Sequence, residues 1–279
     1  MWSLRGGLPR RCGRARKKVG DLTKNGGRGI PRPCIGLGAL IMLDEKNLRR
    51  DEINDDLFLY QIKNGLLFGT DALKLADFIC ENHMGTYKTA IEFGTGSGAI
   101  SLLLARRGKT GRIYAVEIQE VYAQLAEHNV CANGLCERIK IICADLKDCD
   151  NLYCDQKRIV PHSADMVFAN PPYIKYTKDG GKSGMLSELD HKNISRREIE
   201  CNICDVAMSA ARLLKNGGDF YVVYRPDRLL SLIAAMAEHN ITPKKMAFVH
   251  ANPNGEASLV LVKGKQGASE GLKVENIYI

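Results

Sequence analysis

The sequence lacks the features that define several protein classes. It holds no run of about 18 apolar residues, which argues against a transmembrane helix. No apolar core follows the early arginines, so a secretory signal is not expected, and internal repeats are absent. Of the 279 residues, 45% are hydrophobic and 26% charged, which is typical of soluble proteins. The length suits one large α/β domain plus an extension, and we expect a cytoplasmic protein.

Acidic residues are scarce at the start of the chain. Residues 1–40 hold ten Lys or Arg against a single Asp21, out of 40 basic and 32 acidic residues overall. This leaves 30 basic and 31 acidic residues in 41–279, which is therefore nearly neutral. Because 1–41 is Gly- and Arg-rich without an amphipathic period, it is predicted to be a disordered basic tail. It is either an arm that binds nucleic-acid phosphates or a stretch upstream of a native start at Met42.

Paired cysteine motifs are also rare, although the chain has ten cysteines. Cys201-Asn-Ile-Cys204 is the single C-x-x-C, and no second pair at zinc-site spacing accompanies it. The sequence therefore predicts no metal, and reduced, partly buried thiols of the kind found in the cytosol.

From Thr89 onward, buried strand patterns alternate with amphipathic helix patterns, which predicts a parallel, doubly wound sheet. The strands are expected at 90–93, 113–118, 139–144, 164–169 and 220–224, with helices at 99–107, 119–132, 197–214 and 227–239. Two last strands, 246–250 and 258–262, are joined by a short Asn-Pro-Asn-Gly loop and must be antiparallel. The prediction for 89–272 is an α/β, Rossmann-like, seven-stranded methyltransferase sheet, mostly parallel with a C-terminal antiparallel β-hairpin.

The extension before the sheet covers residues 42–88. It begins with a charged stretch, up to Asp56, that is expected to be helical or irregular. An apolar strand at 57–61 precedes Asn64-Gly65, a hairpin-type turn signal, so the next three residues are expected to return as its partner. A helix is expected from Thr70, with that threonine or the aspartate after it as the cap.

A glycine-rich segment, Glu92-Phe-Gly94-Thr-Gly96-Ser-Gly98, follows the first strand of the sheet and opens a helix. Glycines at such a turn let the backbone approach a ligand closely. Alone, this loop also fits the fingerprint of NAD enzymes. Glu92 favours S-adenosylmethionine instead, because a carboxylate beside the turn would repel a dinucleotide's pyrophosphate but can reach the methionine end of this cofactor.

Two more acidic residues stand at successive strand ends. Glu117 ends the second strand and can accept hydrogen bonds from both ribose hydroxyls, and Asp145 ends the third and can accept one from the adenine amine. Read singly, each is a solvated strand-end carboxylate. Together they lie where open α/β sheets bind ligands, so the sequence predicts S-adenosyl-L-methionine as the cofactor. Ile118 and Leu146 are predicted to line the same pocket, which Asn170 also reaches.

The motif Asn170-Pro171-Pro172-Tyr173 ends the fourth strand and is predicted to be catalytic. A planar amine is a poor nucleophile because its lone pair is delocalised. The Asn170 side-chain oxygen and the Pro171 carbonyl can accept its two protons and expose the lone pair, and consecutive prolines hold that carbonyl in place. Tyr173 is expected to stack on the planar substrate. The polar segment 174–196 that follows is either an RNA-contacting lid or a solvated loop.

These motifs resemble those of the class I methyltransferases that use S-adenosylmethionine, and within them the bacterial tRNA1(Val) (adenine-N(6))-methyltransferase family. The likeness runs from about residue 55 to 272. Many amine methyltransferases share Asn-Pro-Pro-Tyr, whereas GTDALKLADF at 69–78 is similar to this family's N-terminal signature. The resemblance implies that the extension, residues 42–88, packs on the cofactor pocket and that Thr70 and Asp71 contact the methionine portion of the cofactor. The segments HANP at 250–253 and EASLVLV at 256–262 are similar to its closing hairpin.

The resemblance implies a tRNA-modifying enzyme that methylates the exocyclic amine of the adenine next to the anticodon of tRNA-Val. The alternatives are an N5-glutamine methyltransferase acting on a release factor, another RNA or DNA adenine methyltransferase, and a non-catalytic RNA-binding protein. Release-factor enzymes carry a larger helical N-terminal domain, and the intact acidic and Asn-Pro-Pro-Tyr motifs argue against a non-catalytic protein. The expected partner is tRNA, without membrane or metal, and the oligomeric state stays open.

Overall fold

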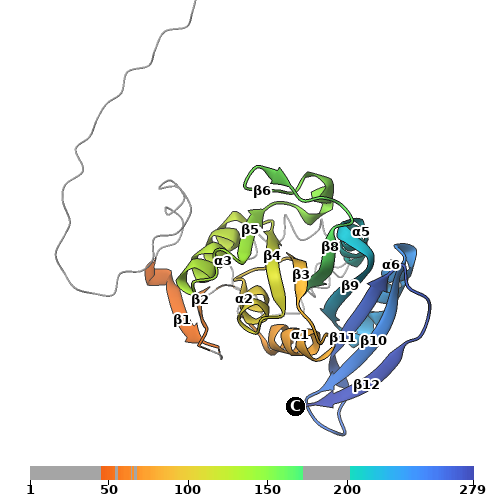
Figure 1. Ribbon diagram of the computed structural model, residues 1–279. Helices are drawn as coiled ribbons and strands as arrows, with labels where there is room; N and C mark the ends of the chain where they lie inside the picture. The colour runs from red at the N-terminus through yellow and green to blue at the C-terminus, as the bar shows by residue number, and fades with distance from the viewer. Residues whose placement is uncertain (1–44, 54–55, 64, 66–67, 172–201) are drawn as a thin grey trace, which may run out of the picture. The chain divides into compact units, whose positions relative to one another are not determined.

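An eight-stranded sheet organises the chain, in the order β12-β10-β11-β9-β8-β3-β4-β5 (Figure 1). The computed structural model describes residues 45–53, 56–63, 65, 68–171 and 202–279, so the predicted tail and the segment 174–196 lie outside the described residues. The strands are β3 (Tyr87–Phe93), β4 (Thr110–Glu117), β5 (Ile139–Cys143), β8 (Ala164–Ala169), β9 (Leu214–Tyr224), β10 (Ile241–His250), β11 (Ala257–Gln266) and β12 (Lys273–Tyr278).

The strand directions confirm the predicted sheet. β5, β4, β3, β8 and β9 are parallel neighbours, and β11 runs antiparallel to both β9 and β10. The eighth strand, β12, adds to the edge parallel to β10, with Met246 opposite Val274. It was not predicted, because an edge strand buries little: its charged and apolar residues are mostly exposed, and the sequence KVENIY has no clear apolar face.

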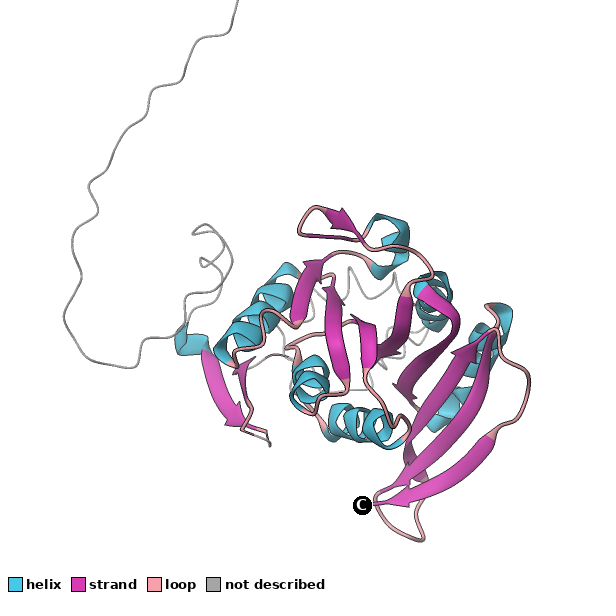
Figure 2. Cartoon of the chain, viewed as in Figure 1, coloured by secondary structure: helices cyan, strands magenta, loops and turns pink. Residues whose placement is uncertain are grey.

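Helices cover both faces of the sheet (Figure 2). The helices α1 (Thr70–Glu81), α2 (Ala99–Arg106) and α3 (Glu120–Ala132) pack on one face, and α5 (Ile203–Leu213), α6 (Leu229–Glu238) and the 3-10 segment η2 (Leu146–Asn151) pack on the other. Each face of the sheet packs against its helices in a separate hydrophobic core, and successive strand residues point alternately into the two cores. In β8, Met166 and Phe168 lie in one core and Val167 and Ala169 in the other. Smaller elements are η1 (Glu45–Asn47), β6 (Tyr153–Cys154), β7 (Lys157–Arg158) and η4 (Pro226–Arg228).

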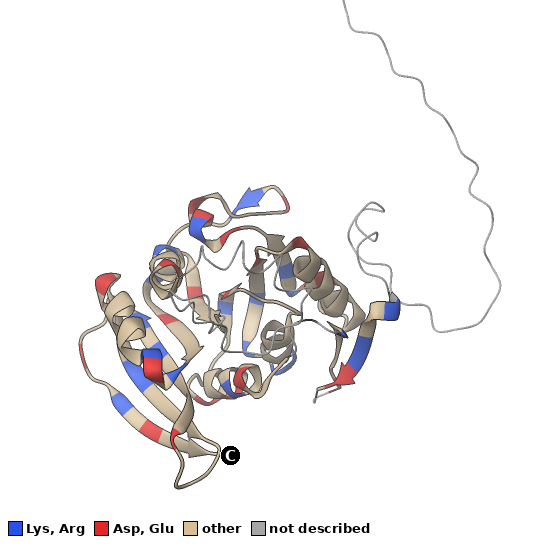
Figure 3. Ribbon diagram, turned by 180° about the vertical axis from the view of Figure 1, so that it is seen from behind, with Lys and Arg blue, Asp and Glu red and all other residues tan. Residues whose placement is uncertain are grey.

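A two-stranded ribbon precedes the sheet, and two expectations about it were wrong. β1 (Leu48–Glu52) is a strand rather than a helical or irregular segment, and it pairs antiparallel with β2 (Phe58–Ile62). The described strand partner of β2 therefore comes before it in the chain. Of the expected returning strand, Phe68 lies in no strand, and Leu66 and Leu67 lie outside the described residues. The strand could not be predicted from the sequence LRRDE, because both faces of the strand are largely exposed and its residues therefore show no apolar alternation. Basic and acidic residues follow one another along this strand (Figure 3).

Asn129 of α3 and Asn133, the C-cap of that helix, bind the second edge of β2. Asn133 accepts from the Phe58 N–H at 3.2 Å and donates to the Phe58 carbonyl at 2.8 Å. One turn earlier, Asn129 does the same for Tyr60, at 2.7 and 2.9 Å. Each amide thus replaces the donor and acceptor of a neighbouring strand, which satisfies backbone groups that burial would otherwise penalise.

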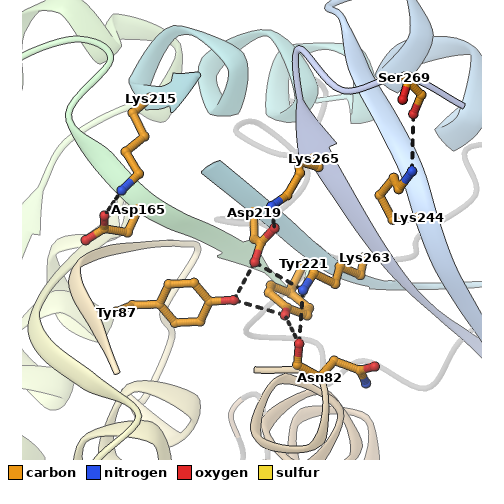
Figure 4. A network of polar contacts seen from close by, with 10 residues as sticks. All are labelled: Asn82, Tyr87, Asp165, Lys215, Asp219, Tyr221, Lys244, Lys263, Lys265 and Ser269. Atoms are coloured by element: carbon orange, nitrogen blue, oxygen red, sulfur yellow. Dashed lines mark hydrogen bonds and ion pairs between the residues drawn. The ribbon is translucent and has the colours of Figure 1, made fainter. Parts of the chain in front are cut away.

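A buried polar network ties the amino end of β3 to β9 and β11 (Figure 4). Asp219 is 5% exposed and accepts from the Tyr87 hydroxyl at 2.7 Å. Lys263 and Lys265 pair with the same carboxylate at 3.1 and 3.6 Å. The hydroxyls of Tyr87 and Tyr221 are 3.0 Å apart, and burial raises the pKa of both. The network lies at the amino end of β3, so the opposite end is left for a ligand.

Two smaller observations complete the fold. The side chains of Cys131 and Cys136 meet sulfur to sulfur, and the expectation of reduced thiols stays a prediction. α3 ends between them, and Gly134, at a φ of 69°, turns the chain so that the two Cα atoms lie 5.2 Å apart. In the described part of the chain, every helix is too short or too polar to cross a membrane.

Candidate active site

Four parallel strands end side by side, and the predicted site residues follow directly from those ends. Register places Phe93 of β3 opposite Val116 of β4 and Ala169 of β8, and Glu117 of β4 opposite Cys143 of β5. The glycine loop, Glu117, Asp145 and Asn170 therefore share one edge of the sheet. β3 is the switch point, because the chain goes from β3 outward to β4 and β5 and then returns to β8 on its other side.

The glycine loop between β3 and α2 has a backbone that demands glycine. Gly94, Gly96 and Gly98 have φ values of 67°, 55° and 85°, a left-handed region that other residues rarely adopt. A Cβ added at Gly94 or Gly96 would meet no atom within 4 Å among those described. Both positions thus face open space above the start of α2, where backbone N–H groups favour a polar ligand.

Glu117 is fixed by the same loop. Its carboxylate is 6% exposed and accepts from the Gly96 N–H and the Gln119 N–H, each at 2.9 Å. Burial raises the pKa of Glu117, whereas these backbone hydrogen bonds oppose that rise. Each oxygen keeps a further lone pair, so the carboxylate is already oriented to accept from a pair of hydroxyls. The next side chain, Ile118, is 40% exposed although apolar, which suits an aromatic base lying over it.

Glu92 lies beneath the loop and is 1% exposed. One carboxylate oxygen accepts from the Thr95 hydroxyl at 2.7 Å and from the Ser101 hydroxyl. Burial raises the pKa of Glu92 to about 7, although both hydroxyls lower it. The structure thus shows Glu92 bracing the glycine loop against α2, and contact with the methionine end of the cofactor stays a prediction.

Asp145 and Leu146 follow β5. Asp145 caps η2 by accepting from the Lys147 N–H at 2.9 Å, and its other oxygen lies 3.6 Å from the Lys147 ammonium. The capping bond uses one lone pair and orients the half-exposed carboxylate at the strand end. Leu146, also half-buried, packs against the core beside it. Their roles toward an adenine stay predictions.

Asn170 follows β8, and its amide nitrogen donates to Asp71 of α1 at 3.0 Å. A carboxylate only accepts, so this contact fixes which end of the amide is nitrogen. The expectation that Thr70 or Asp71 caps α1 was wrong: Gly69 is the N-cap, without a side-chain hydrogen bond, and the other Asp71 oxygen accepts from the Ala72 N–H at 2.9 Å. Thr70, at the helix start, is exposed, and the methionine contacts of Thr70 and Asp71 both stay predictions.

Pro171 is described next to Asn170, whereas the predicted Pro172 and Tyr173 lie outside the described residues. Two contacts at this edge were missed from the sequence. One is the Asp71–Asn170 bond, between residues 99 apart in the chain. The other is Asn129, which also donates to the Ser97 carbonyl of the glycine loop at 2.9 Å and thereby joins the ribbon to the loop. Buried asparagines one turn apart on α3 were the available signal.

Comparisons with known proteins agree with this geometry. A family model described as a methyltransferase domain matches residues 90–191. In structure, the chain is similar to a predicted O-methyltransferase from Agrobacterium tumefaciens, with a TM-score of 0.55 and 19% identity over 75% of this chain and 86% of that one. The fold, the glycine loop and the matched domain make the chain a methyltransferase that uses S-adenosylmethionine as its cofactor.

Its sequence relatives are more specific. The chain is 26% identical to the tRNA1(Val) (adenine(37)-N6)-methyltransferase of Porphyromonas gingivalis, over 69% of this chain and 72% of the relative. It is 28% identical to the enzyme of the same name from Phocaeicola vulgatus, over 74% of this chain and 80% of that one. The predicted class of enzyme and its cofactor are thereby confirmed.

The buried Glu92 gives stability a pH dependence that we predict as follows. The folded-state pKa of about 7 exceeds the ordinary 4.5, so the native state binds this proton more tightly than the unfolded state. The stabilising contribution of the protonated form is then lost as pH rises from about 4.5 to about 7. Glu92→Gln removes this loss. The free energy of unfolding of the variant, relative to that of wild type, should therefore rise by up to about 3 kcal/mol between pH 5 and 8. Urea unfolding at several pH values measures this difference, and a pH-independent difference would contradict the assignment.

Glu117 is predicted to bind the cofactor ribose. Replacing it with Ala or Gln removes a charged acceptor, so cofactor affinity should fall about 10- to 100-fold, as for a lost hydrogen bond to a charged group. Calorimetric titration with S-adenosylmethionine measures the affinity. Glu120→Gln, at the exposed first residue of α3, is the matched control and should bind as wild type does. Unchanged affinity in both Glu117 variants would remove the ribose role.

Proposed function

We propose that this enzyme transfers a methyl group to the exocyclic amine of an adenine in tRNA, namely the adenine next to the anticodon of tRNA-Val. The sequence relatives with that activity in their names support the substrate. The observation that carries the chemistry is the Asn170–Asp71 hydrogen bond at the end of β8, one strand away from the glycine loop. An enzyme with this substrate is expected in the cytoplasm.

Asp71 orients the group that receives the substrate. Because the Asn170 nitrogen donates to this carboxylate, the amide oxygen is the end that can accept a proton from an amine. With the Pro171 carbonyl as the second acceptor, both N–H bonds of an adenine amine are engaged. The nitrogen then moves toward tetrahedral geometry, and its lone pair becomes available for transfer.

The bound cofactor supplies a methyl group on a positively charged sulfur. The chain's own part is to hold the amine and to keep its oxygen acceptors in fixed positions, which lowers the barrier without reorganisation during the reaction. A strong general base is not needed, because the amine proton becomes acidic only as the methyl group arrives. Pro172 and Tyr173 enter the proposal from the sequence alone, as a rigid turn and a stacking platform.

The substrate is tested by offering total tRNA, genomic DNA and a release factor side by side with radiolabelled S-adenosylmethionine. We expect label in tRNA, recovered as N6-methyladenosine after digestion, and concentrated in tRNA-Val. Label in release factor alone would replace the proposal with glutamine methylation. Label in DNA alone would change the proposed substrate from a tRNA adenine to a DNA adenine.

The orienting role of Asp71 is tested by separating turnover from cofactor affinity. Asn170→Ala should abolish transfer while the cofactor still binds. Asp71→Ala should lower kcat roughly tenfold or more, the cost of about one lost charged hydrogen bond, and this loss should exceed any loss of cofactor affinity. Asp77→Ala is the matched control, since Asp77 lies on the same helix and pairs with Arg107 instead.

Near-full turnover of Asn170→Ala would reject its catalytic role. If Asp71→Ala weakened cofactor binding and left kcat unchanged, Asp71 would be a cofactor ligand rather than a positioning residue. If Asp77→Ala lost turnover as well, the defect would belong to α1 as a whole and the assignment to Asp71 would fail.

A further inference from the structure

Three side chains with metal-binding atoms meet where α5 begins and α6 ends. The Cys204 sulfur lies 3.4 Å from a carboxylate oxygen of Glu238 and 3.6 Å from the Nε2 atom of His239. All three donor atoms lie within 4.8 Å of one another. Cys204 and His239 are half-buried and Glu238 is exposed, so an ion could reach the cluster from solvent.

These separations fit a tetrahedral zinc ion. With bonds of about 2.3 Å to sulfur and about 2.0–2.1 Å to nitrogen or oxygen, a tetrahedral angle places a sulfur roughly 3.5 Å from each other ligand atom. The two measured distances from Cys204 fall on either side of that value. Zinc with three protein ligands keeps a fourth position for water or another donor.

The backbones that carry the ligands are held in place. Asn202 caps α5 by accepting from the Cys204 N–H at 2.8 Å and the Asp205 N–H at 3.1 Å, and Asp205 accepts from the Asn202 N–H at 2.9 Å in return. The carbonyl of His239, the C-cap of α6, accepts from the Gln266 side chain at 3.4 Å. Anchored ligands lose little freedom on binding an ion, which favours affinity.

The charges around the cluster also favour a cation. Among the described residues, Glu238 forms no ion pair with Lys or Arg. Two acidic side chains, the Cys204 thiol and the Glu238 carboxyl, thus lie 3.4 Å apart without a positive charge from a described Lys or Arg in an ion pair beside them. A divalent ion would supply that charge and take the thiolate as a soft ligand.

We propose that Cys204, Glu238 and His239 form a zinc-binding site that fastens the start of α5 to the end of α6. Such a site stabilises the native chain by binding it in preference to the unfolded one. α5 is the first element described after Pro171, so the ion would fix the point where the chain rejoins the sheet after the catalytic motif. The proposal is independent of the substrate that the enzyme methylates.

The site is tested on the full chain, stripped with a chelator and titrated with Zn²⁺ and with Co²⁺ as a spectroscopic probe. We expect one equivalent of metal per chain, a Co²⁺ spectrum with a thiolate charge-transfer band and tetrahedral ligand-field bands, and a rise in the thermal midpoint on adding Zn²⁺. Cys204→Ser should abolish the charge-transfer band and the stabilisation by Zn²⁺. His239→Ala and Glu238→Gln should weaken binding by roughly tenfold or more.

Cys154→Ser is the matched control, because Cys154 also lies beside a carboxylate, 3.8 Å from Asp155, but belongs to no three-ligand cluster in the described part of the chain. It should bind metal as wild type does. Circular dichroism of each metal-free variant establishes that it is folded. Absence of stoichiometric uptake by wild type, or a thiolate band that survives in Cys204→Ser and His239→Ala, would overturn the proposal. Neither readout depends on methyl transfer.

Discussion

The register of the parallel strands β5, β4, β3 and β8 is the constraint on which the rest of the site depends. Hydrogen bonds between these strands set their ends level, so residues from four distant parts of the sequence emerge at one edge. A one-residue slip would turn Glu92 or Glu117 to the other face. The polar network around Asp219 lies at the far end of β3 and ties it to β9 and β11 without occupying the ligand edge.

Two carboxylates at this edge serve the cofactor pocket in different ways. Glu92 is buried under the glycine loop and bonded to hydroxyls, so it shapes the loop at a cost in stability when it is ionised. Glu117 is held by backbone N–H groups on both of its oxygens and keeps its remaining lone pairs for a ligand. The same residue type is thus held by side-chain hydroxyls in one position and by backbone N–H groups in the other, and only the second carboxylate is predicted to bind the cofactor ribose.

The N-terminal extension reaches the site through two side-chain contacts. Asn129 joins the backbone of β2 to the Ser97 carbonyl in the glycine loop, and Asp71 joins α1 to Asn170. In both contacts the side chain is carried by a helix, α3 for Asn129 and α1 for Asp71. The extension is therefore joined to both the glycine loop and the Asn170 amide, the two segments at the ligand edge for which the sequence predicts a function.

The sequence by itself determined the strand and helix alternation, the glycine loop and the strand-end residues Glu117, Asp145 and Asn170. Those features depend on local patterns: period-two burial, left-handed turns and motifs next to strand ends. Only the tertiary structure decided the partner of β2, the edge strand β12, the Asp71–Asn170 bond and the meeting of Cys204 with Glu238 and His239. Each of these features joins two segments, and the sequence of one segment does not indicate its partner. Charged edge strands lack an apolar face that would predict their pairing. Polar contacts between residues 34 to 99 positions apart form only once the chain has folded.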